Sequence, residues 1–267
     1  MEHSFLDELS VIDSPIHRLE ARTKIVAFTA LILAAVFLPP ELTWPFAGYL
    51  GFLAALIALA RLPLLPLLKR TAVFGPFILT AVLLLPFTRQ GNGEVALAIP
   101  IGPLQVRIYR AGLLSAKGVL LKSLISAFSV ILLVSTTSFS RLLRALERMH
   151  FPRLLLTVMA LLYRYLFLLL GEFLRLTRAS RARNWEAGSL RIRLRAIGGI
   201  LGSLFLRTYG RGERVYTAML ARGYDGHFRT LTETSLSRRD YAAMAGLLAA
   251  VLAVFVPAVV STAGFWS

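Results

Sequence analysis

The chain has 267 residues, of which 57% are hydrophobic and 16% are charged. Soluble domains average about 45–50% apolar and about 25% charged residues, so this composition excludes a disordered chain, a coiled coil and most soluble enzymes. It indicates a polytopic membrane protein. The net charge of +16, from 30 Lys and Arg against 14 Asp and Glu, is large for so apolar a chain.

Five uncharged windows approach or exceed the length of about 20 helical residues that crosses 30 Å of hydrocarbon. They are residues 25–40, 42–60, 71–88, 123–140 and 241–267. The first is marginal, and the fourth is compatible with a start near Ala111, because the stems of Lys117 and Lys122 can snorkel to an interface. The sequence thus predicts an all-α polytopic membrane protein with about five transmembrane helices, four in residues 25–138 and one in residues 241–267.

Residues 139–240 lie between these two membrane segments and hold most of the excess charge. They contain 19 arginines, no lysine and seven acids. The positive-inside rule predicts a cytoplasmic location for them, which with five spans puts residues 1–24 inside and the C-terminus outside. The loop at residues 89–122 would then lie outside although it is basic, and its alternating residues 104–108 predict a small hairpin.

The first twenty residues carry five acids and no apolar stretch, so we expect no signal peptide.

The basic segment is expected to form a domain of helices. An amphipathic helix starts with Ser140 as a candidate N-cap and ends before Pro152. A second helix is predicted over residues 154–184, and a third over residues 191–220 stops at Gly223.

Two features of these helices leave alternatives open. Gly198 and Gly202 form a small-xxx-small pair that would allow close helix crossing, although two glycines on an exposed face explain the pattern equally well. Residues 154–174 are very apolar but contain Arg164 and Glu172, and charge at the bilayer centre is costly. We favour a long helix buried against other helices at the cytoplasmic edge over a sixth span.

Motifs for several kinds of chemistry are missing from the sequence. There is no phosphate-binding Gly-x-x-x-x-Gly-Lys-Ser/Thr loop, no His-Glu-x-x-His pair and no cysteine. The histidines are scattered at His3, His17, His150 and His227. We therefore expect no catalytic residue, no cofactor and no metal site in this chain. Nucleic acid is disfavoured as a partner because aromatic residues do not accompany the arginines, whereas an arginine-only surface suits a protein with carboxylates.

Two short motifs fall at the predicted ends of the second and third long helices. They are Ala182-Arg183-Asn184 and Ala221-Arg222-Gly223. In each, the small Ala permits close approach, the Arg projects, and Asn or Gly can take the left-handed turn that ends a helix.

With these motifs the chain resembles the transmembrane T component of energy-coupling factor (ECF) importers, most closely the cobalt-uptake CbiQ type. Residues 13–24, DSPIHRLEARTK, are similar to the family's Ser-Pro-Leu-His-Arg-Leu opening. The Thr136-Thr137 pair is similar to the stretch that closes its fourth span, and Arg164-Tyr165 with Glu172 resembles its second coupling helix. The resemblance covers nearly the whole chain.

The resemblance implies a non-catalytic permease subunit of an ABC-type importer in the bacterial cytoplasmic membrane, with long crossed coupling helices in residues 139–240. Its partners would be two cytoplasmic ATP-binding subunits, a membrane S component that binds the metal, and the lipid bilayer. Both Ala-Arg motifs would dock into the ATPases, with Asn184 standing where the family has Gly. The substrate would be cobalt, with nickel or a vitamin as alternatives. The rival from another class is a membrane-bound lipid-modifying enzyme, which would need acidic metal-binding motifs that the sequence lacks.

Overall fold

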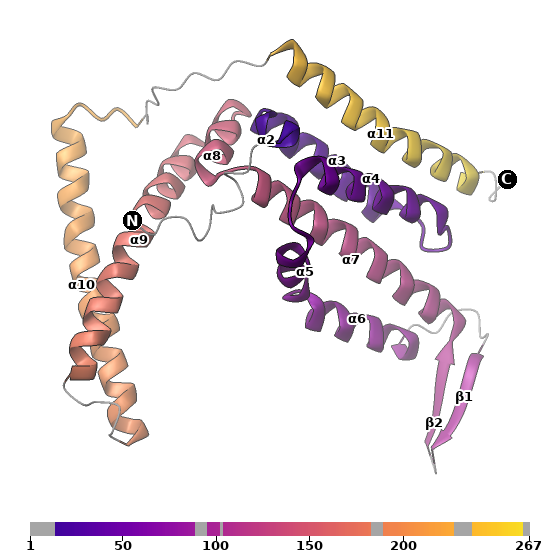
Figure 1. The fold of residues 1–267 in the computed structure, drawn as a ribbon. Coiled ribbons are helices and arrows are strands. Elements are labelled where there is room, and N and C mark those ends of the chain that lie inside the picture. The colour runs from indigo at the N-terminus through magenta and orange to yellow at the C-terminus, as the bar shows by residue number, and fades with distance from the viewer. Residues whose placement is uncertain (1–13, 89–94, 102–103, 183–188, 227–236, 264–267) are drawn as a thin grey trace. The chain divides into compact units, whose positions relative to one another are not determined.

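The computed structural model describes residues 14–88, 95–101, 104–182, 189–226 and 237–263 (Figure 1). The chain divides into a membrane unit, residues 2–142 with 234–267, and a crossed-helix unit, residues 143–233. Helices make up most of both units, which confirms the predicted all-α class. The membrane unit contains α2 (Pro15–Arg18), α3 (Ala21–Phe37), α4 (Trp44–Ala60), α5 (Leu64–Ala72), α6 (Gly75–Thr88), α7 (Arg110–Thr136) and α11 (Arg238–Ala263).

Helix α7 is the central element of the membrane unit and contacts α3, α4, α5 and α6. Two of its glycines permit this close packing. A Cβ atom on Gly112 would lie 2.7 Å from Cα of Pro86 in α6, and one on Gly118 would lie 2.5 Å from Cβ of Pro40. Any side chain at either position would force the neighbouring backbone away.

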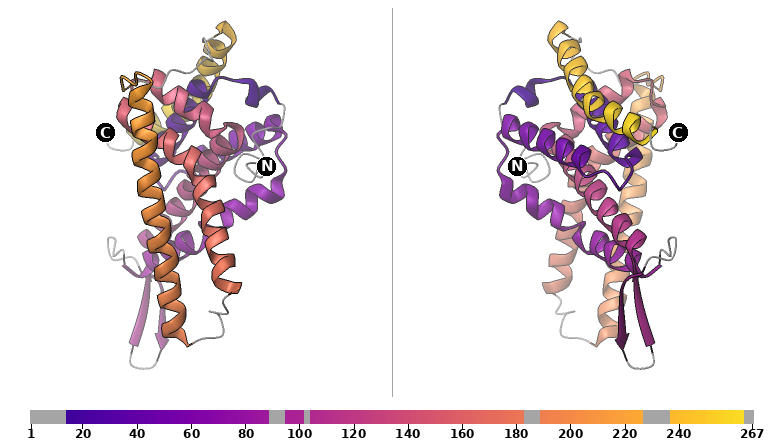
Figure 2. Two further views of the ribbon diagram at one scale, coloured as in Figure 1. Left: turned by 90° about the vertical axis from the view of Figure 1, so that its left-hand side faces the viewer. Right: turned by 90° about the vertical axis from the view of Figure 1, so that its right-hand side faces the viewer.

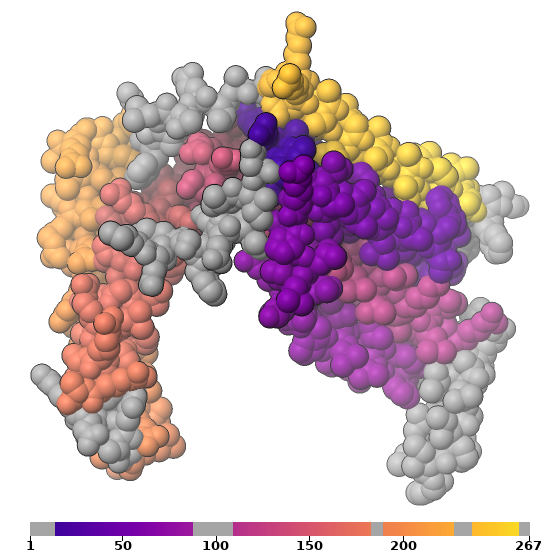
Figure 3. Space-filling view, viewed as in Figure 1, coloured from indigo at the N-terminus to yellow at the C-terminus, as the bar shows by residue number. Residues whose placement is uncertain are grey.

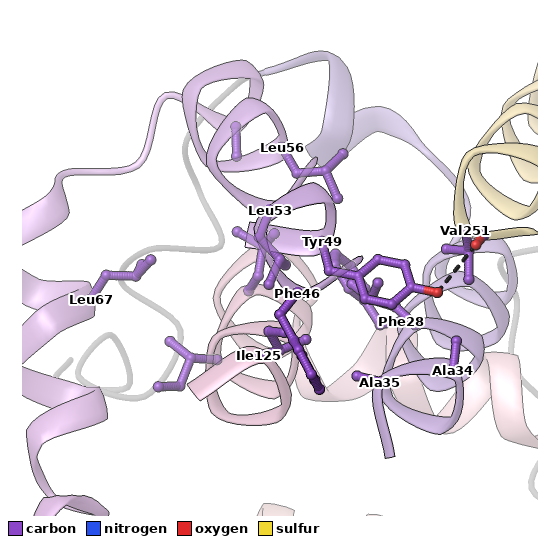
Figure 4. Close-up of a cluster of buried hydrophobic side chains, with 14 of the residues drawn as sticks. Phe28, Ala34, Ala35, Phe46, Tyr49, Leu53, Leu56, Leu67, Ile125 and Val251 are labelled. Carbon is purple, nitrogen blue, oxygen red and sulfur yellow. Dashed lines mark hydrogen bonds between the residues drawn. The ribbon is translucent and has the colours of Figure 1, made fainter. Parts of the chain in front are cut away.

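A hydrophobic core joins α3, α4, α7 and α11 (Figure 4). Phe46 and Tyr49 of α4 are fully buried, and the Tyr49 hydroxyl donates a hydrogen bond to the Val251 carbonyl of α11 at 3.2 Å. That bond satisfies a polar group that would otherwise be buried at a cost. It also holds α11 against the earlier helices, and Figure 3 shows α11 lying along the unit.

The span predicted at residues 71–88 ends where α6 ends, at Thr88, but its predicted start is wrong. Two helices cover this region: α5 ends at Ala72, α6 begins at Gly75, and the pair is bent by 56°. The physical cause is Pro76, which has no N–H for the Ala72 carbonyl and whose ring clashes with that carbonyl in a continuous helix.

Three helices are long and apolar enough to cross a membrane among the described residues: α7, α9 (Arg153–Ala182) and α11. The bent α5–α6 pair passes the same test as one unit, and α4 is apolar but shorter, at 17 residues. The protein is therefore a multi-pass membrane protein. Helix α7 begins at Arg110, which confirms the earlier of the two starts considered for the fourth span, whereas the total of five spans stays a prediction.

A small antiparallel hairpin precedes α7. Its strands are β1 (Val95–Ile101) and β2 (Leu104–Tyr109), paired from Ile101 and Leu104 at the turn to Val95 and Tyr109. The alternation at residues 104–108 predicted this hairpin, and an alternating pattern is typical of a strand.

The crossed-helix unit is built on α9 and α10 (Leu190–Ala221), which follow α8 (Phe139–Arg148). Both long helices match their predicted ranges to within two residues. Ser140 is not an N-cap, because α8 already begins at Phe139 and the Leu142 N–H bonds to the Ser138 carbonyl. Gly198 and Gly202 face open space, so the exposed-face interpretation of this pair is correct. Helix α9 buries only Leu156 and Thr157, so the expected burial of residues 154–174 against other helices is not found.

Candidate functional site

The C-terminal end of α10 carries the motif Ala221-Arg222-Gly223. Gly223 has φ +76, and its N–H donates to the Leu220 carbonyl at 2.9 Å. The next N–H, that of Tyr224, reaches back to the Met219 carbonyl at 3.0 Å. These two bonds form a Schellman motif, in which a left-handed residue satisfies the last carbonyls of a helix. The predicted left-handed turn at Gly223 is confirmed.

This turn fixes the direction of the chain on either side of Arg222. Arg222 is the C-cap residue, with φ −94 and ψ 11, and both Ala221 and Arg222 are exposed. A Cβ atom added to Gly223 would meet no other atom within 4 Å, so the space around the turn is open. The arrangement presents a guanidinium beside a small side chain at a rigid helix end, which suits a carboxylate or backbone carbonyls on a partner.

The C-terminal end of α9 carries the second motif. Ala182 is the last residue of α9 and is exposed. Arg183 and Asn184 lie outside the described residues. The helix end therefore falls where the motif predicts, whereas the left-handed turn at Asn184 stays a prediction.

Glu172 connects the two long helices. Its carboxylate accepts a hydrogen bond from Arg207 of α10 and another from Arg175 of α9, both at 2.5 Å. Only 15% of the Glu172 side chain is exposed, against 60% for Arg207. The charged pairs thus fix where α9 and α10 meet, and the neighbouring Leu169, Leu206, Arg211 and Arg214 help to line a cavity of about 370 Å³ beside them.

A second contact shows that α9 and α10 run antiparallel (Figures 1 and 2). The Tyr224 hydroxyl lies 3.5 Å from Oγ1 of Thr157. A residue later than Arg207 in the chain thus contacts a residue earlier than Glu172. Ala182 is ten residues beyond Glu172 in one direction, and Ala221 is 14 residues beyond Arg207 in the other. At about 1.5 Å per helical residue, Ala182 and Ala221 lie roughly 35 Å apart along the helix pair.

A further left-handed residue lies at the end of α8. His150 has φ +62, and the Phe151 N–H bonds to the Leu146 carbonyl at 3.1 Å, as in the glycine-capped helix end. A non-glycine residue in this conformation costs about 1–2 kcal/mol. The sequence indicated a break at Pro152 but not this turn, and His, which is enriched in the left-handed region, was the available signal.

Ser14, His17 and Lys24 of the opening motif are buried in the membrane unit. Ser14 caps α2 through the His17 N–H, and its hydroxyl lies 2.7 Å from Nδ1 of His17. Lys24 is 1% exposed, and its Nζ donates to the Thr136 carbonyl of α7 at 2.8 Å and to the His17 carbonyl at 3.4 Å. Arg141 donates to the same His17 carbonyl at 3.4 Å. This cluster joins the opening motif to both ends of the segment between α7 and α8.

The chain is similar in sequence to known transport proteins. The chain is 32% identical to the cobalt transport protein CbiQ of Salmonella typhimurium over 153 residues, 57% of this chain and 68% of that protein. It is 36% identical to the nickel permease LarQ of Lactiplantibacillus plantarum over 109 residues, 41% of this chain and 39% of that protein. It is 29% identical to the energy-coupling factor transporter transmembrane protein EcfT of Bacillus selenitireducens over 224 residues, 80% and 81% of the two chains.

The family match also covers both units. The model for the cobalt transport protein family CbiQ matches residues 13–234, from the opening motif through the end of α10 and beyond. This range includes the Lys24 cluster, the Glu172 contacts and both Ala-Arg motifs. The chain therefore belongs to the CbiQ cobalt transport protein family, as a multi-pass membrane component of a transporter.

Proposed function

We propose that this chain is the non-catalytic coupling subunit of an ECF-type importer in the cytoplasmic membrane. In this role it transmits the movements of two cytoplasmic ATPases to a membrane S component that binds the substrate. The names of the relatives CbiQ and EcfT support a transport role. The N-terminus and the crossed-helix unit would face the cytoplasm, as the positive-inside rule predicts.

The observation that carries the proposal is that Ala182 and Ala221, with which the two Ala-Arg motifs begin, lie at opposite ends of one antiparallel helix pair. The helical rise places these two ends roughly 35 Å apart. This separation suits two separate partner proteins better than one. Ala182-Arg183-Asn184 would dock on one ATPase and Ala221-Arg222-Gly223 on the other. When the ATPases approach each other on binding ATP, the two ends would be drawn together.

The contact at Glu172 gives this movement a pivot. Because Glu172 bonds to both helices, a force on either end would rotate α9 against α10 about this point. Rigid helices transmit such a rotation along their full length, and crossing angles are set by side-chain contacts of this kind. The S component would then be tilted or released by the change in angle.

The docking role is tested by replacing Arg222 and measuring complex formation. An arginine that pairs with a partner's carboxylate in a buried interface typically contributes about 2–5 kcal/mol. Arg222→Ala should therefore lower the affinity for the ATPases about 30-fold or more. Arg214→Ala is the matched control, because Arg214 is exposed on the same helix two turns earlier. Unchanged co-purification and transport by Arg222→Ala would contradict the proposal.

Cobalt is the substrate we propose, and nickel is the second candidate because of the similarity to LarQ. The chain would be reconstituted with its ATPases and S component in proteoliposomes. ATP-dependent uptake of radioactive cobalt, with nickel accumulated at least about tenfold more slowly, is the expected result. Preferential nickel uptake would replace the substrate while leaving the coupling role intact.

A further inference from the structure

We propose that the membrane unit holds an anionic phospholipid in a two-part site between α2, α3, α4 and α11. The inner part is a cavity of about 350 Å³ whose lining residues are apolar except for Lys24. The outer part is a cavity of about 600 Å³ that is lined by three arginines, Arg18, Arg61 and Arg239. Pro15 and Leu19 line both cavities, so the two parts adjoin.

The two parts follow one another along two separate elements, in opposite chain order. On α11, Ala243, Gly246 and Leu247 line the apolar part. Arg239 and Asp240, one turn earlier, line the basic part together with Ser237, which directly precedes the helix. On α4, Phe52, Leu56 and Leu59 line the apolar part, and Arg61, directly after the helix, lines the basic part. Apolar walls that give way to arginines on two helices match an amphiphile with a long apolar tail and a charged head.

The charge of the outer part selects an anion. The carboxylate among its lining residues, Asp240, already accepts hydrogen bonds from the Glu20 N–H at 3.1 Å and the Ser237 N–H at 2.9 Å. It thus bonds to the protein backbone, whereas the guanidinium-bearing side chains of Arg61 and Arg239 line the cavity. Guanidinium binds phosphate oxygens in a bidentate manner, and basic pockets between transmembrane helices bind anionic lipid head groups.

The combination favours a phospholipid over an apolar helix of another protein. An apolar helix would fill the inner part but would offer no anion to Arg61 and Arg239. A free phosphate would bind these arginines but leave the inner part unfilled. A phospholipid satisfies both, with one acyl chain against Phe28, Leu31 and Leu56 and the phosphate between Arg61 and Arg239.

The head-group half is tested by lipid titration of the full chain, purified with its partner subunits and delipidated. Native mass spectrometry would compare phosphatidylglycerol with phosphatidylcholine. Each arginine near a lipid phosphate changes affinity by about fivefold, so Arg61→Gln with Arg239→Gln should weaken phosphatidylglycerol binding about 25-fold. The control is Arg238→Gln, an exposed neighbour outside the cavity, with an expected change under about twofold.

The acyl-chain half is tested by filling the inner cavity. A Cβ on Gly246 meets no atom within 4 Å, so Gly246→Leu should fold normally and occupy the space. It should reduce bound phosphatidylglycerol at least about tenfold, whereas Gly51→Leu, at an equally open glycine outside the cavity, should not. Glycerophosphate, which has the head group without acyl chains, should fail to compete. Equal binding of both lipids would overturn the proposal. So would equal effects of Arg238→Gln and of the double variant Arg61→Gln with Arg239→Gln, or no detectable binding of the added lipid.

Discussion

Gly223 shows how one residue sets the geometry of the proposed docking end. Its positive φ allows the chain to leave α10 while the last carbonyls of the helix stay bonded. A side chain at this position would meet no neighbouring atom, so the requirement for glycine comes from the backbone and not from crowding. The position of Arg222 thus depends on a conformation that other residues rarely adopt.

Gly223→Ala is expected to destabilise the end of α10 by about 1 kcal/mol, because alanine resists the left-handed conformation. Gly212→Ala is the matched control, since Gly212 is inside the same helix and also faces open space. It should stabilise the protein by about 0.5–1 kcal/mol through its higher helix propensity. Thermal unfolding followed by far-ultraviolet circular dichroism measures both, and equal shifts would contradict this account.

The contribution of Lys24 to stability depends on its burial. Its ammonium group is enclosed and donates to the Thr136 carbonyl at the end of α7. Lys24→Met keeps the apolar stem but removes the donor, so it should destabilise the protein by about 2 kcal/mol. Lys122→Met removes a similar bond, to the Val36 carbonyl at 2.7 Å, at a position of α7 that is only partly buried. Its cost should stay below about 1 kcal/mol, and chemical unfolding in detergent would separate the two.

At the scale of elements, the contact between α9 and α10 depends on charge. Arg207→Glu would place two carboxylates against each other at Glu172, and like charges at short distance repel. We expect the helices to separate or pivot, which spin labels on the exposed residues Val158 and Tyr216 would report as a longer or broader distance distribution. Arg195→Glu introduces the same charge change at an exposed position of α10 outside the cavity that Glu172 and Arg207 line. A distribution that both variants leave unchanged would show that the pair does not set the crossing.

The sequence predicted elements well where the cause is local. Pro152 separates α8 from α9, and the glycine after α10 ends that helix, because each acts on the chain within one turn. Pro76 acts just as locally, but the span at residues 71–88 was predicted from a run of uncharged residues. Such a run reflects polarity alone and takes no account of how a proline changes the backbone. Ser140 failed as a cap because α8 starts one residue earlier, and such boundaries depend on the details of the turn.

The parts of the site that were missed depend on contacts between distant residues. Glu172 was noted for its resemblance to a family pattern, but its partner Arg207 lies 35 residues away on another helix. Any of several arginines on α10 could have served as that partner, so sequence spacing did not select one. The Lys24 cluster was recognisable as a motif, whereas its bond to Thr136 is set by the packing of α3 on α7.

At the scale of the whole molecule, polar side chains join the two long helices of the crossed-helix unit at two separated places in its described part. One is the Glu172 pair and the other is Thr157 with Tyr224, 15 residues away along α9. Two points of contact fix a crossing angle, and a single point permits rotation. A coupling subunit that works by rotation must therefore release the second contact while keeping the first.

This requirement predicts the effect of a cross-link. Because the chain has no cysteine, Thr157→Cys with Tyr224→Cys gives one unique pair for a cleavable bifunctional reagent. The linked protein should still bind its ATPases, since Arg222 is unaltered, but uptake should fall at least about tenfold because the angle is locked. Cleavage of the linker should restore uptake, and each single-cysteine variant treated with the reagent controls for modification. Full uptake by the linked protein would show that the two helices form a fixed scaffold, and that movement reaches the S component by another route.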